Sequence, residues 1–249
     1  MYIDLHGHLD KVEDIDKVVD NAKVAGVSIA VCSGISPKSN RKALYLSKRY
    51  SIIKPTIGLY PIDAMQNEIK KEYEPDVDAE MDFIRQHKNE IGAIGEIGLD
   101  FKTGNDKEEQ EKLFRRQLEL AKELDKPVII HSRKAEAKVF DILKDYDVKV
   151  ILHCFSGKKK LVLEGIKREY YFTVPTNVVR SEQFQFMAKE VPLSQLFCET
   201  DTPFLSPYPD KSNEPAFIVE SYKMIAKIKE MELTEVTNII YNNYQKLFL

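Results

Sequence analysis

The feature that most constrains the fold of this sequence is the regular alternation of short apolar runs with longer amphipathic stretches. Eight runs rich in β-branched and aromatic residues recur along the chain, and the segments between them carry apolar residues at helical spacing. The runs are YIDLHGHL, SIAVCSG, SIIKPTIGLYP, IGAIGEIGLD, PVIIHSR, VKVILHCF, YYFTVPTN and LFCETDTPF. Because repeated strand–helix–strand units pair their strands in parallel, the pattern predicts an α/β fold built on a parallel sheet.

The helical segments set the limits of these units. The clearest helical patterns cover residues 14–25, 108–124 and 135–145, with Gly26 and Pro127 as stop signals near the ends of the first two. Two further helical patterns, over residues 214–230 and 234–248, follow the eighth run.

The number of units favours a closed barrel. Eight strand–helix units in 249 residues match a (β/α)8 barrel. A doubly wound open sheet is the alternative, but no G-x-G-x-x-G sequence follows the first run. No linker-like stretch interrupts the alternation of strand and helix patterns. We therefore expect residues 1–249 to form one domain, a TIM barrel with an extra C-terminal helix.

Charge, hydropathy and cysteine content narrow the class of protein. A net charge of -3 argues against a protein that coats nucleic acid through basicity, so any polyanion must be bound locally. No apolar run is long enough for a membrane span or a signal peptide, which favours a cytoplasmic protein without a membrane partner. Nothing indicates an obligate protein partner. Cys32, Cys154 and Cys198 lack C-x-x-C spacing and are expected to be free thiols, with Cys154 facing away from His153.

Ionisable residues interrupt the apolar runs near their C-terminal ends. In a (β/α)8 barrel these ends converge on one mouth, where active sites are found. The sequence therefore predicts that side chains from five runs meet in one bowl. They are His6 and His8 in the first run, Glu96 in the fourth, His131 in the fifth, His153 in the sixth, and Glu199 with Asp201 in the eighth.

This set of side chains points to metal binding. Four histidines and two carboxylates at one depth would be costly to bury without partners. Imidazole and carboxylate groups suit transition metals, and six ligands exceed the needs of one tetrahedral ion. Two divalent ions bridged by Glu96 are the resulting hypothesis. Asp4 is expected either to orient an imidazole or to make a buried contact with the backbone. Glu199 is expected to tune the metal site, to hold a ligand histidine or to bind substrate.

Five stretches in order, IDLHGHLD, GEIGLDF, IIHSRKA, ILHCFSG and ETDTPFL, with NNYQKLF near the end, resemble the TatD family of metal-dependent deoxyribonucleases over residues 2–249. The resemblance implies a TIM barrel with two divalent ions, such as zinc, magnesium or manganese. It implies phosphodiester hydrolysis, typically the removal of nucleotides from a 3' end of single-stranded DNA. The family's ligands fall on His6, His8, Glu96, His131, His153 and Asp201.

The resemblance also indicates residues that contact substrate, and the sequence differs from the family's pattern at one motif. Arg133 matches a family position just outside the metals and is expected to clamp a substrate phosphate, the alternative being a surface ion pair. Family members often show a G-x-H-P-H-like motif after the third strand, where this chain reads GLYPIDA. Tyr60 and Ile62 thus stand where histidines would be expected. Tyr60 can still donate a hydrogen bond or stack on a base.

The predicted mechanism gives each carboxylate a role. Asp201 is the candidate proton acceptor for the attacking water, and Glu96 is the bridging ligand. Further candidates for substrate binding lie in segments near the predicted mouth. They are Phe101, Lys102, Phe155, Lys158 and Tyr208.

Two other functions remain open at this point. One is a metal-dependent hydrolase of a carbonyl substrate, such as a cyclic amide, a lactone or D-aminoacyl-tRNA. Related amidohydrolases often bridge their metals with a modified lysine where this chain has Glu96, which favours the nuclease. The other is a catalytically silent barrel that binds nucleic acid or a protein. Such a barrel would be expected to lose ligands, and all six are present.

Overall fold

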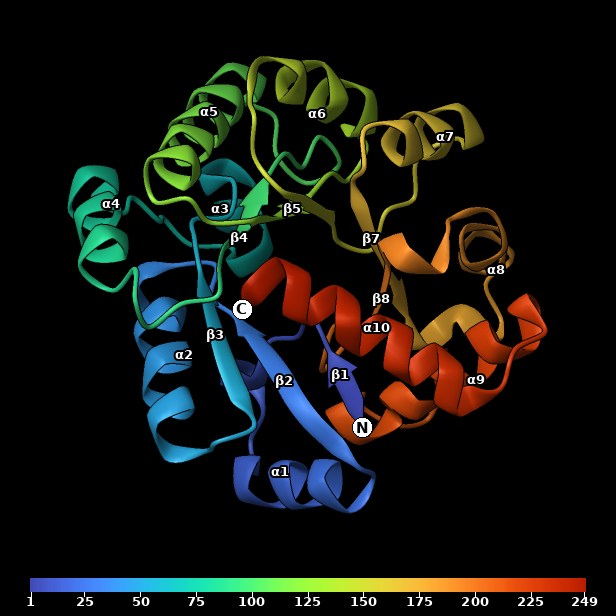
Figure 1. The fold of residues 1–249 in the computed structure, drawn as a ribbon. Helices are drawn as coiled ribbons and strands as arrows, with labels where there is room; N and C mark the ends of the chain where they lie inside the picture. The colour runs from blue at the N-terminus through green and yellow to red at the C-terminus, as the bar shows by residue number, and fades with distance from the viewer.

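The eight apolar runs form eight parallel strands that follow one another in chain order around a barrel (Figure 1). The computed structural model describes residues 1–249. The strands are β1 (Tyr2–Asp4), β2 (Val27–Ser33), β3 (Ile53–Ile57), β4 (Ala93–Gly98), β5 (Val128–His131), β6 (Val150–Leu152), β7 (Tyr171–Pro175) and β8 (Leu196–Glu199). The predicted (β/α)8 barrel is confirmed.

Helices lie outside the barrel (Figure 1). They are α1 (Ile15–Val24), α2 (Pro37–Arg49), α3 (Ile62–Ile69), α4 (Val77–Gln86), α5 (Lys107–Glu123), α6 (Glu136–Ile142), α7 (Lys159–Lys167), α8 (Glu182–Glu190), α9 (Val219–Lys229) and α10 (Leu233–Phe248). Capping residues set several of the starts: the Asp14 side chain accepts a hydrogen bond from the backbone N–H of Lys17 at 3.1 Å, and Asp106 caps α5 in the same way. No helix is both long enough and apolar enough to span a membrane.

The predicted helical segments agree with the structure apart from their ends. The segment predicted over residues 135–145 is α6 followed by a single 3₁₀ turn, Leu143–Asp145. The segment predicted over residues 214–230 likewise begins with a 3₁₀ turn, Pro215–Ile218, before α9. Two helices, α3 and α4, occupy the interval between β3 and β4.

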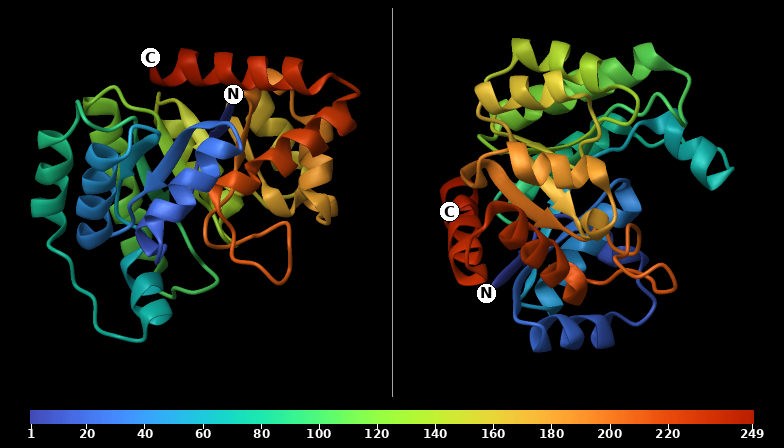
Figure 2. Two further views of the ribbon diagram at one scale, coloured as in Figure 1. Left: turned by 90° about the horizontal axis from the view of Figure 1, so that it is seen from below. Right: turned by 90° about the vertical axis from the view of Figure 1, so that its right-hand side faces the viewer.

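The extra C-terminal helix α10 lies across the N-terminal end of the barrel. Its Asn243 side chain donates hydrogen bonds to the carbonyls of Leu193 and Leu196, at the start of β8. At the C-terminal end of the helix, the Phe248 ring lies over Gly92, just before β4. Figure 2 (left) shows α10 along one end and the orange loop after β8 projecting from the opposite end. The mouth formed by the C-terminal strand ends is therefore left open.

The barrel closes where the segment that follows β1 meets the C-terminal half of β8 and the residues after it. Three backbone hydrogen bonds form this seam: Leu5 N–H to Cys198 O (2.9 Å), Asp201 N–H to His6 O (2.9 Å) and His8 N–H to Thr202 O (2.7 Å). The chain was expected to remain a strand through His8, but β1 ends at Asp4. The seam, rather than strand alternation, positions His6 and His8.

Asp4 lies under this seam and joins its two sides. Its Oδ1 accepts a hydrogen bond from the backbone N–H of Thr200 at 2.7 Å, and its Oδ2 lies 2.6 Å from the Thr200 hydroxyl. Of the two roles expected for Asp4, the structure thus shows the contact with backbone and not with an imidazole. Asp4 is 1% exposed, and this burial raises its pKa to about 8. The neutral carboxyl is therefore favoured in the folded protein at pH 7.

This buried carboxyl makes the stability pH-dependent with a defined sign. The pKa of Asp4 is about 8 when folded and about 4 when unfolded, so its stabilising contribution is complete below pH 4 and is lost as the pH rises towards 8. Asp4→Asn mimics the neutral carboxyl. We expect urea unfolding in EDTA to show the variant gaining stability over the wild type as pH rises, by on the order of 5 kcal/mol at pH 9.

The exposed Asp147 provides a control for this experiment. Asp147→Asn should leave the pH dependence of the unfolding free energy unchanged. Parallel curves for Asp4→Asn and the wild type would contradict the assignment of the proton to Asp4.

Candidate metal centre

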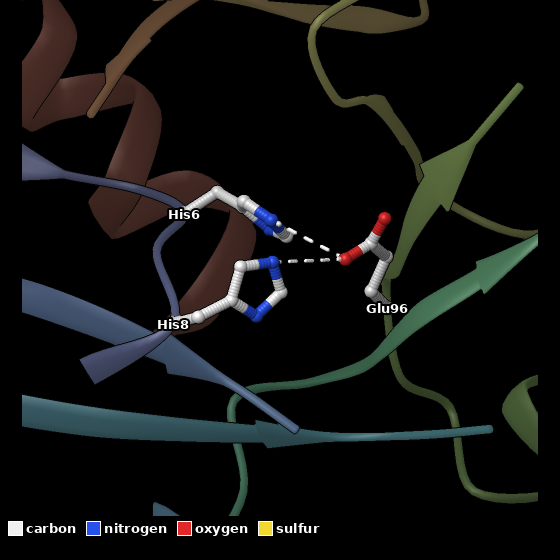
Figure 3. Close-up of side chains that lie close together, drawn as sticks. All are labelled: His6, His8 and Glu96. Carbon is white, nitrogen blue, oxygen red and sulfur yellow. Dashed lines mark ion pairs between the residues drawn. The ribbon is translucent and has the colours of Figure 1, made fainter. Parts of the chain in front are cut away.

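The structure brings the six predicted ligands together at the C-terminal mouth of the barrel. Glu96 Oε2 lies 3.4 Å from His6 Nε2 and 3.5 Å from His8 Nε2 (Figure 3). Asp201 Oδ1 lies 3.7 and 3.6 Å from the same two nitrogens. Four potential ligand atoms, from the ends of β1, β4 and β8, therefore face a common point.

The donor set of this first group fits a metal ion. His6 Nε2 is buried and has no hydrogen-bond partner, which would be costly unless another group completes the site. Ligand atoms held tetrahedrally at bonds of about 2.1 Å are about 3.4 Å apart. The distances from Glu96 and Asp201 to the two histidine nitrogens, 3.4–3.7 Å, are close to this value.

A second group of ligand atoms surrounds the other oxygen of Glu96. Oε1 lies 2.8 Å from His131 Nδ1 and 3.8 Å from His153 Nε2. His6, His153 and Asp201 also lie close enough to share an ion, and this set links the two groups. Glu96 thus presents one oxygen to each group, which is the arrangement that a carboxylate bridging two ions requires.

The imidazoles of the first group and His153 are held through their outer nitrogens. The Nδ1 atom of His8 lies 3.1 Å from the Ser33 carbonyl, and that of His6 lies 3.0 Å from the Ser33 hydroxyl. The Nδ1 atom of His153 lies 2.8 Å from Glu199 Oε2. When a partner accepts a hydrogen bond from Nδ1–H, Nε2 is unprotonated and its lone pair is directed towards the centre.

His131 is turned the other way, with Nδ1 inward. Its Nε2 lies 3.3 Å from Asp100 Oδ2 and 3.2 Å from the Tyr60 hydroxyl. Tyr60 donates to the same Asp100 oxygen at 2.6 Å, and backbone N–H groups of Lys102 and Thr103 bind the other oxygen at 2.8 Å each. Tyr60 was proposed from sequence as a substrate contact. In the structure its hydroxyl instead donates a hydrogen bond to Asp100 and helps to hold His131 in place.

Burial and charge set the protonation of the carboxylates in this cluster. Burial raises the pKa of Glu96, but contacts with His131 and His6 and the charge of His153 outweigh it, so the pKa is well below its ordinary value. Burial raises the pKa of Asp201 to about 6 and that of Glu199 to about 7. Of these two carboxyl groups, only that of Asp201 lines the cavity at the mouth.

Five of the six candidate ligands, all except the fully buried His6, line a cavity of about 410 Å³ that also includes Arg133 and Tyr60 in its wall. The Arg133 side chain is 46% exposed, and its Nη1 lies 4.0 Å from Asp100 Oδ2. Glu199 is fully buried beneath His153 and is not part of the cavity wall. The expectation that Glu199 contacts substrate does not fit this position, whereas holding a ligand histidine does.

Several weaker sequence expectations also differ from the structure. None of the five further substrate candidates lines the cavity: Phe101, Lys102, Phe155, Lys158 and Tyr208. Phe155 is fully buried in the core, and Ile62 begins α3 outside the cavity wall. Cys154, expected to face away from His153, lines the cavity because its backbone takes a left-handed conformation with φ 43°.

Sequence reasoning missed three residues of the site. Asp100 shares strand parity with Glu96 across GEIGLD, a signal that could have identified it. Lys11 and Phe204 line the cavity from the segments after β1 and β8. They follow ligands by three residues each, but nothing in their spacing shows which way they face. A larger cavity, of about 800 Å³, lies at the opposite end of the barrel and contains none of the ligands.

A (β/α)8 barrel with clustered histidines and carboxylates at its C-terminal mouth fits a metal-dependent hydrolase. Residues 3–249 match the model of the family described as TatD related DNase, and the chain belongs to this family. It is 35% identical to deoxyribonuclease TATDN3 of Homo sapiens, covering 99% of this chain and 94% of that protein. It is 40% identical to an uncharacterised metal-dependent hydrolase of Methanocaldococcus jannaschii, covering 99% and 96%.

Solved structures agree with this assignment. The TatD homologue YJJV from Escherichia coli superposes with a TM-score of 0.87 at 25% identity, covering 99% of this chain and 97% of that chain. A TatD family hydrolase from Entamoeba histolytica has the same fold, with a TM-score of 0.87 at 22% identity, covering 100% and 98%. The protein is thus a metal-dependent hydrolase whose relatives include named deoxyribonucleases.

The contacts of Tyr60 and Asp100 with His131 lead to a prediction for metal affinity. Tyr60→Phe removes the hydroxyl that binds Asp100 and lies beside His131 Nε2. Because partners of ligand histidines typically contribute 10- to 100-fold to metal affinity, we expect roughly a tenfold weaker Co²⁺ affinity, measured by titration of its visible absorption. Tyr50→Phe, which removes a similar hydroxyl bond to Asp16, is the matched control. Equal affinities in the two variants would show that Tyr60 has no such role.

Glu199 provides a second test of the same principle. Glu199→Ala leaves His153 Nδ1 without its partner, so we expect roughly a 10- to 100-fold loss of metal affinity by isothermal titration calorimetry. Glu199→Gln keeps an oxygen acceptor for the imidazole and should recover most of the affinity. A Glu199→Gln variant as weak as Glu199→Ala would argue that charge, rather than orientation of His153, is what Glu199 contributes.

Proposed function

We propose that this protein is a cytoplasmic 3'–5' exonuclease that hydrolyses single-stranded DNA at a centre of two divalent ions, such as zinc, magnesium or manganese. The observation that carries the proposal is the position of Glu96, whose two oxygens face two separate groups of potential ligands. The nuclease-named relatives support a nucleic acid substrate. Three unpaired cysteines are in keeping with a reducing compartment.

Each ligand has a defined task in this proposal. His6, His8 and Asp201 would hold one ion, His131 and His153 the other, and Glu96 both. Two divalent ions at such a site supply an activated nucleophile and positive charge for in-line displacement at phosphorus. Asp201 is the residue assigned to accept the proton of the attacking water, because its carboxylate lies beside His6 and His8 and lines the cavity, whereas Glu199 is buried away from it.

Arg133 is assigned to the substrate phosphate. Its Nη1 lies 4.0 Å from Asp100 Oδ2, and the side chain lines the cavity, so its N–H groups are available to an anion. The cavity volume of about 410 Å³ is in the range of small-ligand sites. A site of this size suits the end of a single strand better than the interior of a duplex, which supports exonuclease action.

The proposal is tested with single-stranded DNA labelled at its 5' end and protein reconstituted with Mg²⁺, Mn²⁺ or Zn²⁺. We expect a ladder of products shortened stepwise from the 3' end. Asp201→Asn, checked for metal content and assayed at saturating metal, should lower kcat by roughly 10²–10⁴-fold, because it removes the proton acceptor. Arg133→Ala should instead act mainly on KM.

Two outcomes would contradict the proposal. Unchanged turnover in metal-loaded Asp201→Asn would remove Asp201 as the base. A metal-loaded wild-type protein that cleaves no phosphodiester but hydrolyses D-aminoacyl-tRNA would replace the nuclease assignment by that of an acyl-ester hydrolase.

A further inference from the structure

Phe204 is an exposed aromatic residue on the rim of the candidate metal centre. Its side chain is 49% exposed and forms part of the cavity wall. It follows Asp201 by three residues, in the loop that projects from the open end of the barrel (Figure 2, left, orange). An exposed phenylalanine alone says little, but this one stands where a substrate of the proposed function would enter.

The backbone of Phe204 is held rigidly, although its ring is exposed. Its N–H donates to the carbonyl of Asp201 at 2.7 Å, and its carbonyl accepts from Asn213 Nδ2 at 2.7 Å. Asn213 is itself 3% exposed and also binds the Thr200 carbonyl at 2.6 Å. The backbone that carries the ring therefore has a defined position relative to Asp201, which leaves only the side-chain torsions to be ordered when a partner binds.

A cation and a ligand histidine lie next to the ring. The Phe204 centroid is 6.2 Å from that of His8, with the rings at 70°. The Nζ atom of Lys11 lies 5.2 Å from the Phe204 centroid, and Lys11 lines the same cavity. The ammonium lies over one face of the ring. Proteins bind single-stranded nucleic acids by combining aromatic rings, on which bases stack, with cations that attract the phosphates.

We propose that Phe204 is the stacking platform for the base of the 3'-terminal nucleotide, and that Lys11 binds the adjoining backbone phosphate. This inference rests on the proposed function and specifies how the same site holds its substrate. Because every base offers a π face, the platform predicts binding of the terminal nucleotide with little preference for its base.

Tyr208, in the same loop, is a matched control for Phe204. It is 41% exposed and has Lys211 Nζ 5.4 Å from its ring centroid. Its ring packs edge-on against Phe217 at 5.0 Å and is not part of the cavity wall. The two residues thus share exposure, loop and a neighbouring lysine, and differ in access to the metal centre.

The test measures cleavage of 5'-labelled oligonucleotides that end in a normal or an abasic 3' nucleotide. Phe204→Ala should lower kcat/KM on the normal end by about five- to a hundred-fold, mostly through KM, and should change cleavage of the abasic end little. Phe204→Trp should restore the normal end, and Tyr208→Ala should match the wild type on both. Equal activity of Phe204→Ala and wild type on the normal end, or equal losses on both ends, would overturn the inference.

A binding measurement separates this inference from the proposed function. A 3'-terminal 2-aminopurine should lose fluorescence when stacked, and stopped-flow mixing records this before cleavage. Quenching by the wild type and by Tyr208→Ala, but not by Phe204→Ala, supports the platform even if no cleavage follows, in which case the exonuclease proposal alone fails. Equal quenching by all three proteins overturns the platform whatever the cleavage assay shows.

Discussion

The interaction on which the site depends most is the closure of the barrel between β1 and β8. A cyclic sheet needs its first and last strands to pair, because open edges leave backbone groups unsatisfied. Here the pairing continues past both strands, through hydrogen bonds from Asp201 N–H to His6 O and from His8 N–H to Thr202 O. Three of the candidate ligands, His6, His8 and Asp201, are thus among the residues that close the barrel. Closing the barrel brings these three side chains together, and Glu96 joins them from β4.

Concentrating carboxylates in this closed mouth has an electrostatic consequence. Glu96 is 3% exposed and Glu199 is fully buried, and buried anions are unfavourable unless they are paired. The protein shifts the pKa of Asp201 and Glu199 upward and holds the imidazoles by their outer nitrogens. It still leaves the inner nitrogen of His6 without a partner. Bound cations would satisfy these groups together, which explains why the ligands, their partners and the cavity form one network.

The site could be predicted from sequence to the extent that strand order determines position. Polar residues that end apolar strands in a barrel must meet at one mouth, and the six predicted ligands do lie there. Residues outside the strands were predicted less well. Strand parity placed Cys154 away from the cavity, but its left-handed backbone turns it inward. Tyr208 and Phe204 are both aromatic residues of one loop, and sequence reasoning selected the one that packs on Phe217.

The sequence by itself determined the barrel, its strand order and the identity of the metal-ligand candidates. Apolar periodicity and strand ends are local properties of the sequence, and neighbouring strands in the chain are also neighbours in the barrel. Only the tertiary structure decided how those candidates are oriented and which neighbours serve them. Tyr60 braces His131 through Asp100, Glu199 holds His153 from below, and Phe204 faces the cavity. Each of these depends on hydrogen bonds or packing between residues far apart in the chain, and the periodicity of one segment does not specify such contacts.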